Sequence, residues 1–230
     1  MATPLERTIG HTFTNERLLR EAMTHRSYIN ENPAWDTPHN ERLEFLGDAV
    51  LELAITERLY TAFPQETEGA MTSLRAALVN HSMLSSIART IDLDASIRLS
   101  RGEAKDTGRA RDMILADAVE ALIGALYVDG GYEAAKRFVD AFVYPHIDEV
   151  MTAQAYKDPK STLQERVQER ERITPIYRVL AERGPDHDRM FDVGVYVDNR
   201  CVGRGTGHSK QEAETEAARN ALQAYDPQGA

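Results

Sequence analysis

Three carboxylates lie within one predicted helix, and their spacing is the first chemical signal in the sequence. Glu41, Glu44 and Asp48 belong to residues 40–60, a stretch in which apolar residues recur at intervals of three and four. At about 100° per residue, the three acids share one narrow arc of the helix, bordered by apolar residues. The arc is either a solvated acidic face or a group partly withdrawn from water, where isolated charges are costly.

A second predicted helix favours the withdrawn alternative. Asp117 and Glu120 are three positions apart and therefore neighbours on one helix face, whereas nearly every other residue of 114–128 is apolar or glycine. A helix that is apolar all round is a buried helix, so its two acids need a compensating partner. Gly47 and Gly124 lack side chains and would allow the two helices to approach closely.

Paired carboxylates on two helices suggest a site for a hard divalent cation. Like charges raise one another's pKa or push the helices apart, and a cation removes that penalty. Carboxylates and water suit Mg²⁺ or Mn²⁺, and the absence of neighbouring Cys and His disfavours Zn²⁺. Because carboxylate-bound Mg²⁺ commonly serves phosphate chemistry, the residues predict a metal-dependent phosphoryl-transfer enzyme.

The overall charge argues against binding of nucleic acid. The 230 residues carry a formal net charge of −10, whereas phosphate binding needs clustered Lys and Arg. The net charge is a sum over the whole chain, so it does not exclude a local basic surface. Cys201 is the only cysteine, so an intrachain disulfide is excluded and a reducing cytoplasm is expected. The chain lacks an apolar run of the roughly 20 residues that span a bilayer and a secretory signal, so no membrane association is predicted.

The chain divides into two patterns. Residues 5–150 are predicted to be helical, with helices at residues 16–28, 40–60, 73–91, 110–128 and 132–150, and a loop at 101–110. After about residue 151 a polar stretch is followed by a helix at 161–171, strands at 174–184, 188–198 and 200–207, and a helix at 209–225. We therefore predict an all-α domain in residues 1–151, a linker in residues 152–158, and a small α+β domain of order α-β-β-β-α in residues 159–227.

Several motifs resemble ribonuclease III, the endonuclease of double-stranded RNA, over nearly the whole chain. In the helical part they are TFTNERLLREAMTHRSY, NERLEFLGDAVLEL, FPQETEGAMTSLRAALVN and ADAVEALIGALYVDGG. In the α+β part, DPKSTLQERVQ, GPDHDRMFDV and GTGHSKQEAETEAA are similar to the double-stranded-RNA-binding module. The resemblance implies an all-α nuclease domain followed by an α-β-β-β-α RNA-binding domain.

The resemblance assigns roles to individual acids. The positions that match the family's metal-binding carboxylates are Glu44, Asp48, Asp117 and Glu120. Asp48 and Glu120 match the positions most closely tied to hydrolysis. Glu41 and Glu68 match acids that assist RNA placement and cutting, with a structural or dimer-interface role as the alternative. Asn40 is also in the family motif, where it is either a helix N-cap or an RNA contact. Mg²⁺ is the implied cofactor, with Mn²⁺ as a substitute, and one or two ions would fit.

The family works as a homodimer in which each subunit cuts one strand, and a twofold axis suits a duplex substrate. Phe45 and Leu46 lie in the segment that resembles the dimer interface, although ordinary core positions are an equal alternative. The implied products carry 5′-phosphate and 3′-hydroxyl ends with a short 3′ overhang. Ribosomal and other structured RNA precursors are the implied substrates.

In the RNA-binding module, the resemblance implies contacts from both helices and one turn. Gln164 and Glu165 would bond to 2′-hydroxyls, and His187 would reach a second minor groove. Ser209 and Lys210 would set the N-terminus of the last helix against phosphates, with the helix dipole assisting.

The start of the last helix departs from the family pattern. Lys210 is followed by Gln211 and Glu212, with Glu214 and Glu216 beyond, where relatives often have more Lys or Arg. Residues 158–226 hold eleven Lys and Arg against thirteen Asp and Glu. We therefore expect modest affinity for duplex RNA and few ion contacts. An RNA-binding scaffold without nuclease activity is the alternative function, but such relatives typically lose acids, and all six are present here.

Overall fold

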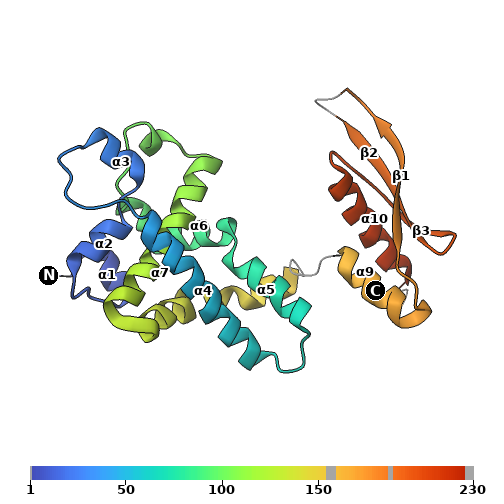
Figure 1. Ribbon diagram of the computed structural model, residues 1–230, viewed down its shortest axis with the longest axis horizontal. Coiled ribbons are helices and arrows are strands. Elements are labelled where there is room, and N and C mark those ends of the chain that lie inside the picture. Colours follow the sequence, from blue (N-terminus) through green and yellow to red (C-terminus); the bar gives the residue numbers. More distant parts are fainter. Residues whose placement is uncertain (1, 154–158, 186–188, 226–230) are drawn as a thin grey trace. The chain divides into compact units, whose positions relative to one another are not determined.

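The computed structural model describes residues 2–153, 159–185 and 189–225. The chain divides into two compact units, Met1–Tyr156 and Lys157–Ala230, shown in Figure 1. The predicted all-α domain followed by an α-β-β-β-α domain is confirmed. Within the described residues, no helix combines the length and the apolar character needed to cross a membrane.

Helices form the first unit. They are α1 (Pro4–Ile9), α2 (Glu16–Ala22), α3 (Arg26–Glu31), α4 (Glu41–Ala62), α5 (Glu68–Val79), α6 (His81–Thr90), α7 (Arg109–Phe138) and α8 (Ile147–Ala153). Short 3-10 turns occupy Leu93–Ala95, Glu103–Lys105 and Tyr144–His146, and a π-helical turn occupies Val139–Val143. The predicted loop at 101–110 therefore contains one helical turn and the start of α7.

The centre of this unit is the contact between α4 and α7. Every residue of α7 from Leu115 to Leu126, apart from Asp117 and Glu120, is buried. This burial confirms the prediction from the all-round apolar pattern. Burying each large aliphatic side chain contributes about 1.5–3 kcal/mol to the free energy of folding. The helix is therefore fixed in place by its own core.

Two glycines allow α4 and α7 to touch backbone to backbone. A Cβ at Gly47 would lie 1.8 Å from the carbonyl oxygen of Glu120, and a Cβ at Gly124 would lie 2.1 Å from the carbonyl oxygen of Leu43. Neither position can hold a side chain without separating the helices. The close approach predicted from the two glycines is confirmed.

Three predicted helices are broken in the structure. The stretch 132–150 passes from α7 through the π-helical turn Val139–Val143 and the 3-10 turn Tyr144–His146 to α8, and the other two each contain a residue outside the helix. The stretch 16–28 forms α2 and α3, because Thr24 leaves the helix and forms a short parallel bridge with Arg98. The stretch 73–91 breaks at Asn80, whose side chain accepts a hydrogen bond from the backbone N–H of Met83 and so caps α6. Hydrophobic periodicity continues through both breaks and does not register them.

The helix predicted at 110–128 is longer in the structure. α7 continues to Phe138 across Gly131, whose backbone angles (φ 71°, ψ −175°) are not helical. A positive φ of this kind favours glycine, and the chain changes direction there. The Gly130–Gly131 turn in the sequence is thus a kink between two helical segments.

The second unit is a three-stranded antiparallel sheet with two helices. Its elements are α9 (Pro159–Glu171), β1 (Ile176–Arg183), β2 (Met190–Val197), β3 (Arg200–Gly207) and α10 (Lys210–Tyr225), and the sheet order is β1-β2-β3. Val193, Val195 and Val197 are buried against Leu163 and Val167 of α9 and the alanines of α10. The apolar residues that alternate along β2 therefore face the side of the sheet that the helices cover.

Candidate functional site

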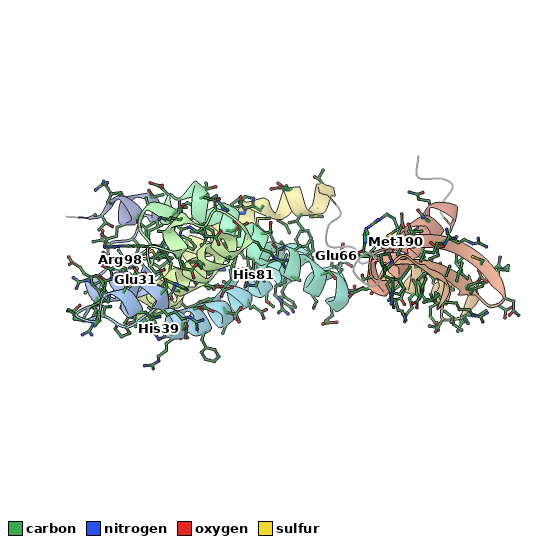
Figure 2. All side chains as sticks on the ribbon, turned by 90° about the horizontal axis from the view of Figure 1, so that it is seen from above. Glu31, His39, Glu66, His81, Arg98 and Met190 are labelled. Carbon is green, nitrogen blue, oxygen red and sulfur yellow. The ribbon has the colours of Figure 1, made fainter. Side chains whose placement is uncertain are left out.

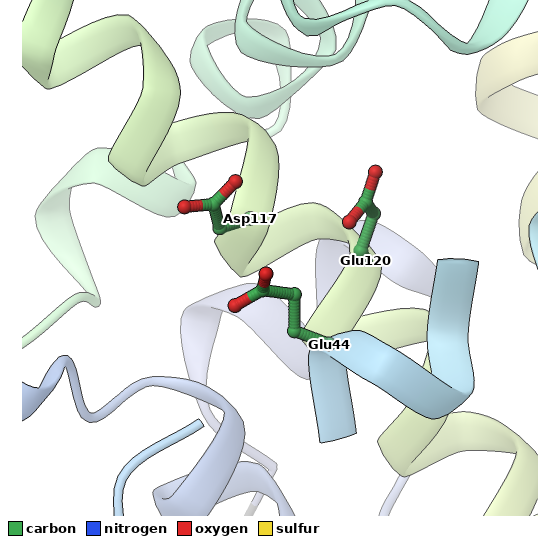
Figure 3. A group of neighbouring side chains, drawn as sticks. All are labelled: Glu44, Asp117 and Glu120. Atoms are coloured by element: carbon green, nitrogen blue, oxygen red, sulfur yellow. The ribbon is translucent and has the colours of Figure 1, made fainter. Parts of the chain in front are cut away.

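Three of the predicted carboxylates meet where α4 crosses α7. Each of Glu44, Asp117 and Glu120 offers an oxygen atom, and these atoms all lie within 4.8 Å of one another. Figure 3 shows Glu44 extending from α4 toward Asp117 and Glu120 of α7. The side chains reach one another because Gly47 and Gly124 bring the two helix backbones together. We call these three residues the acidic cluster.

The acidic cluster holds its charges at an energetic cost. Burial raises the pKa of Glu120 to about 8, and the neighbouring carboxylates add to the effect. Burial also raises the pKa of Glu44 to about 7, with Asp117 the strongest of the neighbouring charges. The pKa of Asp117 is raised by burial as well, against the opposing charges of His81 and His25. Near neutral pH the cluster therefore retains protons that a bound cation would displace.

The fourth predicted metal ligand lies beside the cluster. Asp48 is exposed on α4, one turn beyond Glu44, and is not among the three residues whose oxygens converge. Its charge nevertheless raises the pKa of both Glu44 and Glu120. The structure thus brings together three of the four carboxylates and leaves Asp48 near them in a more solvated position.

The two further predicted acids have other partners. The Glu41 carboxylate lies 3.4 Å from Arg26 and 3.8 Å from His39, and it is about half exposed. Glu68 is the first residue of α5, and its carboxylate accepts a hydrogen bond from the Thr72 hydroxyl at 3.2 Å. Neither side chain joins the acidic cluster in a single copy of the chain.

Asn40 occupies the N-cap position of α4, one of its two predicted roles, but without a capping side chain. Its side chain makes no capping hydrogen bond, and its backbone is already in a helical conformation (φ −76°, ψ −14°). The residue is 1% exposed, and its Nδ2 has no partner among the described residues. The helix instead begins from the Asn40 carbonyl, which accepts from the backbone N–H groups of Leu43 and Glu44.

Two histidines that were not among the predicted site residues act on the charge of Asp117. His25 precedes α3, and burial lowers its pKa. His81, labelled in Figure 2, is the first residue of α6, and its charge, like that of His25, acts on Asp117. The Thr24–His25 pair lies within a motif that resembles the family, so His25 had a sequence signal. His81 had none, because its neighbourhood depends on how α6 packs on α7.

Comparison with known proteins assigns the chain to a family. The sequence pattern described as Ribonuclease-III-like matches residues 15–147, and the double-stranded RNA binding motif matches residues 159–225. The chain is 44% identical over 228 residues to Ribonuclease 3 of Desulforamulus reducens, covering 99% of this chain and 93% of that protein. It is 46% identical over 222 residues to Ribonuclease 3 of Nitratidesulfovibrio vulgaris, covering 96% and 87%. The chain belongs to the ribonuclease III family.

A solved structure supports the family assignment for the helical part. The nuclease domain of ribonuclease III from Campylobacter jejuni matches with a TM-score of 0.56 and 38% identity, covering 62% of this chain and 95% of that one. That structure is described as showing flexibility in a region involved in dimer formation. As a member of this family the chain is an endoribonuclease, and below we call its two units the nuclease unit and the RNA-binding unit.

The RNA contacts predicted for this chain, apart from His187, lie in or directly before two helices of the RNA-binding unit. Gln164 and Glu165 are exposed on α9. The hydroxyl of Ser209 accepts a hydrogen bond from the backbone N–H of Glu212 at 3.1 Å, and so caps α10. His187 lies outside the described residues.

Lys210 is the first residue of α10 and is held by neighbours from the sheet. Its Nζ lies 3.5 Å from a carboxylate oxygen of Glu182, near the end of β1. The same atom lies 5.5 Å from the centre of the Phe191 ring on β2, within the range of a cation–π contact. The cation predicted to face phosphate thus already has an acidic neighbour.

The acids that weaken the family pattern at α10 have internal partners. Glu212 accepts a hydrogen bond from the backbone N–H of His208, and Glu214 lies 2.6 Å from the ammonium of Lys160. Glu216 accepts hydrogen bonds from the backbone N–H and the hydroxyl of Thr206. Elsewhere in the unit, Glu171 pairs with Arg200 at 2.7 Å and Asp192 with Arg183 at 3.0 Å. Glu214, Glu171 and Asp192 of the RNA-binding unit are therefore each paired with a cation of the same unit.

Proposed function

We propose that the chain cleaves double-stranded RNA by Mg²⁺-dependent hydrolysis of phosphodiester bonds at the acidic cluster. The observation that carries the proposal is the convergence of Glu44, Asp117 and Glu120 within 4.8 Å in a chain of the ribonuclease III family. The proposed organisation is a nuclease domain in residues 1–151, a linker in residues 152–158 and an RNA-binding domain in residues 159–227.

The acidic cluster fits a hard divalent cation. Its oxygens are close enough to share one ion, and burial together with mutual repulsion raises the pKa of Glu44 and Glu120. Asp48 would complete the set from the solvent side. Mg²⁺ and Mn²⁺ both accept carboxylate oxygens, so Mn²⁺ should substitute. When bound, the cation supplies the Lewis acidity that activates water and stabilises the leaving oxygen.

The acids of the nuclease unit are assigned to two tasks, the hydrolytic step and the placement of RNA. Glu120 and Asp48 are the residues we assign to the hydrolytic step, and the buried backbone of α7 keeps Glu120 in place. Glu41, near Arg26 and His39, and Glu68, at the start of α5, are assigned to RNA placement and cutting. Each has an exposed carboxylate that can act toward a substrate or a second subunit.

The RNA-binding unit would hold the duplex by its shape. Gln164 and Glu165 on α9 are assigned to 2′-hydroxyls of one minor groove, and His187 to the next groove. Ser209 and Lys210 are assigned to phosphates at the N-terminus of α10, where the helix dipole favours anions. These contacts read the geometry of the duplex rather than its sequence.

A homodimer is the proposed working form, with one strand cut by each subunit. Phe45 is 84% exposed and Leu53 is 57% exposed on α4, and exposed apolar side chains of this size mark interaction surfaces. A Phe45→Asp variant should therefore sediment as a monomer where the unaltered chain sediments as a dimer. The proposed location is the cytoplasm.

The proposed products carry 5′-phosphate and 3′-hydroxyl ends with a short 3′ overhang, and the proposed substrates are ribosomal and other structured RNA precursors. Purified protein is incubated with a long RNA duplex in Mg²⁺ or in EDTA. We expect short duplexes in Mg²⁺ alone, whose 5′ ends accept a kinase label only after phosphatase treatment. Equal survival of the RNA in both solutions would contradict the nuclease and favour a scaffold that only binds RNA.

A further inference from the structure

Glu182 joins two cations that border the proposed phosphate-binding surface. Its carboxylate lies 3.5 Å from Lys210 Nζ at the start of α10 and 3.5 Å from the Arg189 guanidinium just before β2. All three side chains are accessible to solvent, with exposures of 41% for Glu182, 58% for Lys210 and 42% for Arg189. A carboxylate is thus in contact with the lysine that the RNA backbone would use.

A carboxylate oxygen and a phosphate oxygen are the same kind of partner for a lysine ammonium. Both are anionic acceptors of charge-assisted hydrogen bonds. A lysine already neutralised by a carboxylate releases fewer counterions when it meets phosphate, so it adds less to the affinity. The carboxylate also stays within a Debye length, about 10 Å at 0.1 M salt, of any phosphate that Lys210 binds.

We propose that Glu182 limits the affinity of the RNA-binding unit by competing with RNA phosphate for Lys210. The inference rests on the proposed binding of duplex RNA by this unit and adds a residue to it that disfavours the complex. Glu182 differs in this respect from Glu212, whose carboxylate accepts the backbone N–H of His208 just before α10, and from Glu216, whose carboxylate accepts the backbone N–H of Thr206 in β3.

The opposite role, in which Glu182 positions Lys210 for RNA, has less physical support. Exposed ion pairs of this length stabilise by only about 0–1 kcal/mol and therefore hold a flexible side chain weakly. The Phe191 ring, 5.5 Å from Lys210 Nζ, remains as a second contact if the carboxylate is removed. Loss of Glu182 should therefore release the charge of Lys210 without displacing its side chain.

The test compares Glu182→Gln with a matched control in the full-length protein. Binding to an RNA duplex of about 24 base pairs, longer than the ~16 that one module spans, is measured in EDTA across a salt series. Asp198→Asn makes the same charge change in the turn between β2 and β3, at the other end of β3 from α10. Asn is well suited to the φ of 54° found there.

We expect Glu182→Gln to lower Kd about three- to fivefold near 0.1 M salt and to make the slope of log K against log salt more negative by about 0.9, one additional neutralised phosphate. Asp198→Asn should change Kd less than twofold, with an unchanged slope. In a protein that already carries Lys210→Ala, Glu182→Gln should lower Kd much less than it does in the unaltered protein, because its effect depends on that lysine. Melting temperatures should stay alike.

Four outcomes would overturn the inference. Weaker binding by Glu182→Gln would make Glu182 a positioning residue, and an unchanged Kd would make the ion pair irrelevant to RNA. A gain of equal size in Asp198→Asn, or one that survives Lys210→Ala, would assign the effect to overall charge or to Arg189. A wild-type protein that binds no duplex at any salt would instead overturn the proposed RNA binding itself.

Discussion

The two units arrange their acids in opposite ways. In the nuclease unit, Glu44, Asp117 and Glu120 face one another, and burial raises the pKa of each. In the RNA-binding unit, acids such as Glu182 and Glu214 face lysines. The first arrangement favours a cation from solution, and the second already pairs several cations of its own surface with acids.

The contrast shows why a net charge of −10 is a poor guide to nucleic-acid binding here. Acids that a bound cation neutralises do not repel a phosphate in the same way as free ones. Lysines that already have acidic partners add less to phosphate binding than their number suggests. The sum of charges treats all these groups alike, whereas their neighbours decide what each can do.

The largest expected effect comes from removing one charge of the acidic cluster. Glu120→Gln keeps the volume of the side chain but removes an anionic ligand, and we expect cleavage to fall on the order of 10³-fold, about 4 kcal/mol in the barrier. Duplex binding in EDTA should be retained, because the other unit supplies it. Glu133→Gln, an exposed acid on the same helix, is the control. Loss of binding together with cleavage would make Glu120 a structural residue.

The next effect concerns the contact that forms the cluster. Gly124→Ala would place a methyl group 2.1 Å from the Leu43 carbonyl, and we expect a loss of about 3 kcal/mol in the free energy of unfolding. Gly69→Ala in α5 meets no atom within 4 Å and should stabilise by about 0.4–1 kcal/mol. Urea unfolding measures both. Similar effects of the two variants would contradict the backbone contact between α4 and α7.

A smaller effect should appear in the pH dependence of stability. The pKa of Glu44 is about 7 and that of Glu120 about 8, both above the value of 4.5 for a free glutamate. The metal-free native state then binds more protons than the unfolded chain, so its free energy of unfolding falls as pH rises from about 5 to 8.

Mg²⁺ should restore that stability, by up to about 3 kcal/mol at roughly 100 times its dissociation constant. The gain should be larger at pH 8 than at pH 6, because Mg²⁺ binds the deprotonated carboxylates. Melting curves of the whole chain with Mg²⁺ or EDTA at both pH values provide the measurement. Equal Mg²⁺ stabilisation of an Asp117→Asn variant would place the ion elsewhere.

The smallest effect distinguishes the RNA-binding unit from a strongly basic one. Because Lys160, Lys210 and Arg200 have acidic partners, the slope of log K against log salt for a short duplex should be shallower than about −5, fewer than roughly six neutralised phosphates. A titration in EDTA between 50 and 200 mM salt, roughly the range over which such slopes are resolved, measures it. A steeper slope would show that the internal pairs open on binding.

The sequence predicts the site better than it predicts the helix ends. Residues three or four apart share a helix face, so Asp117 with Glu120 could be read from spacing, and Gly47 with Gly124 explained how two helices could meet. The break at Thr24 could not be predicted, because it depends on a bridge to Arg98, more than seventy residues away. In Figure 2 the Arg98 side chain is labelled, and it also lies 5.0 Å from the Trp35 ring.

The same distinction applies to the predicted site residues. Asp48 and Glu44 share one arc of the helical wheel, yet Asp48 is exposed. Its exposure depends on which other elements pack over that arc, and a helical wheel holds no information about them. The pairing of Lys210 with Glu182 brings together the start of α10 and the end of β1, and no local pattern relates these two segments. Contacts within one helix were therefore predictable, and contacts between elements were predictable only where small residues indicated them.

The backbone contact at Gly47 and Gly124 also restricts how this chain can change by mutation. A core side chain that grows too large can often be accommodated by trimming its neighbour. Here the atoms that a new Cβ would meet are main-chain atoms of Glu120 and Leu43, which every amino acid carries. A substitution at either glycine therefore has no second-site suppressor among the residues it touches, and both positions should be depleted of all alternatives in a library selected for activity.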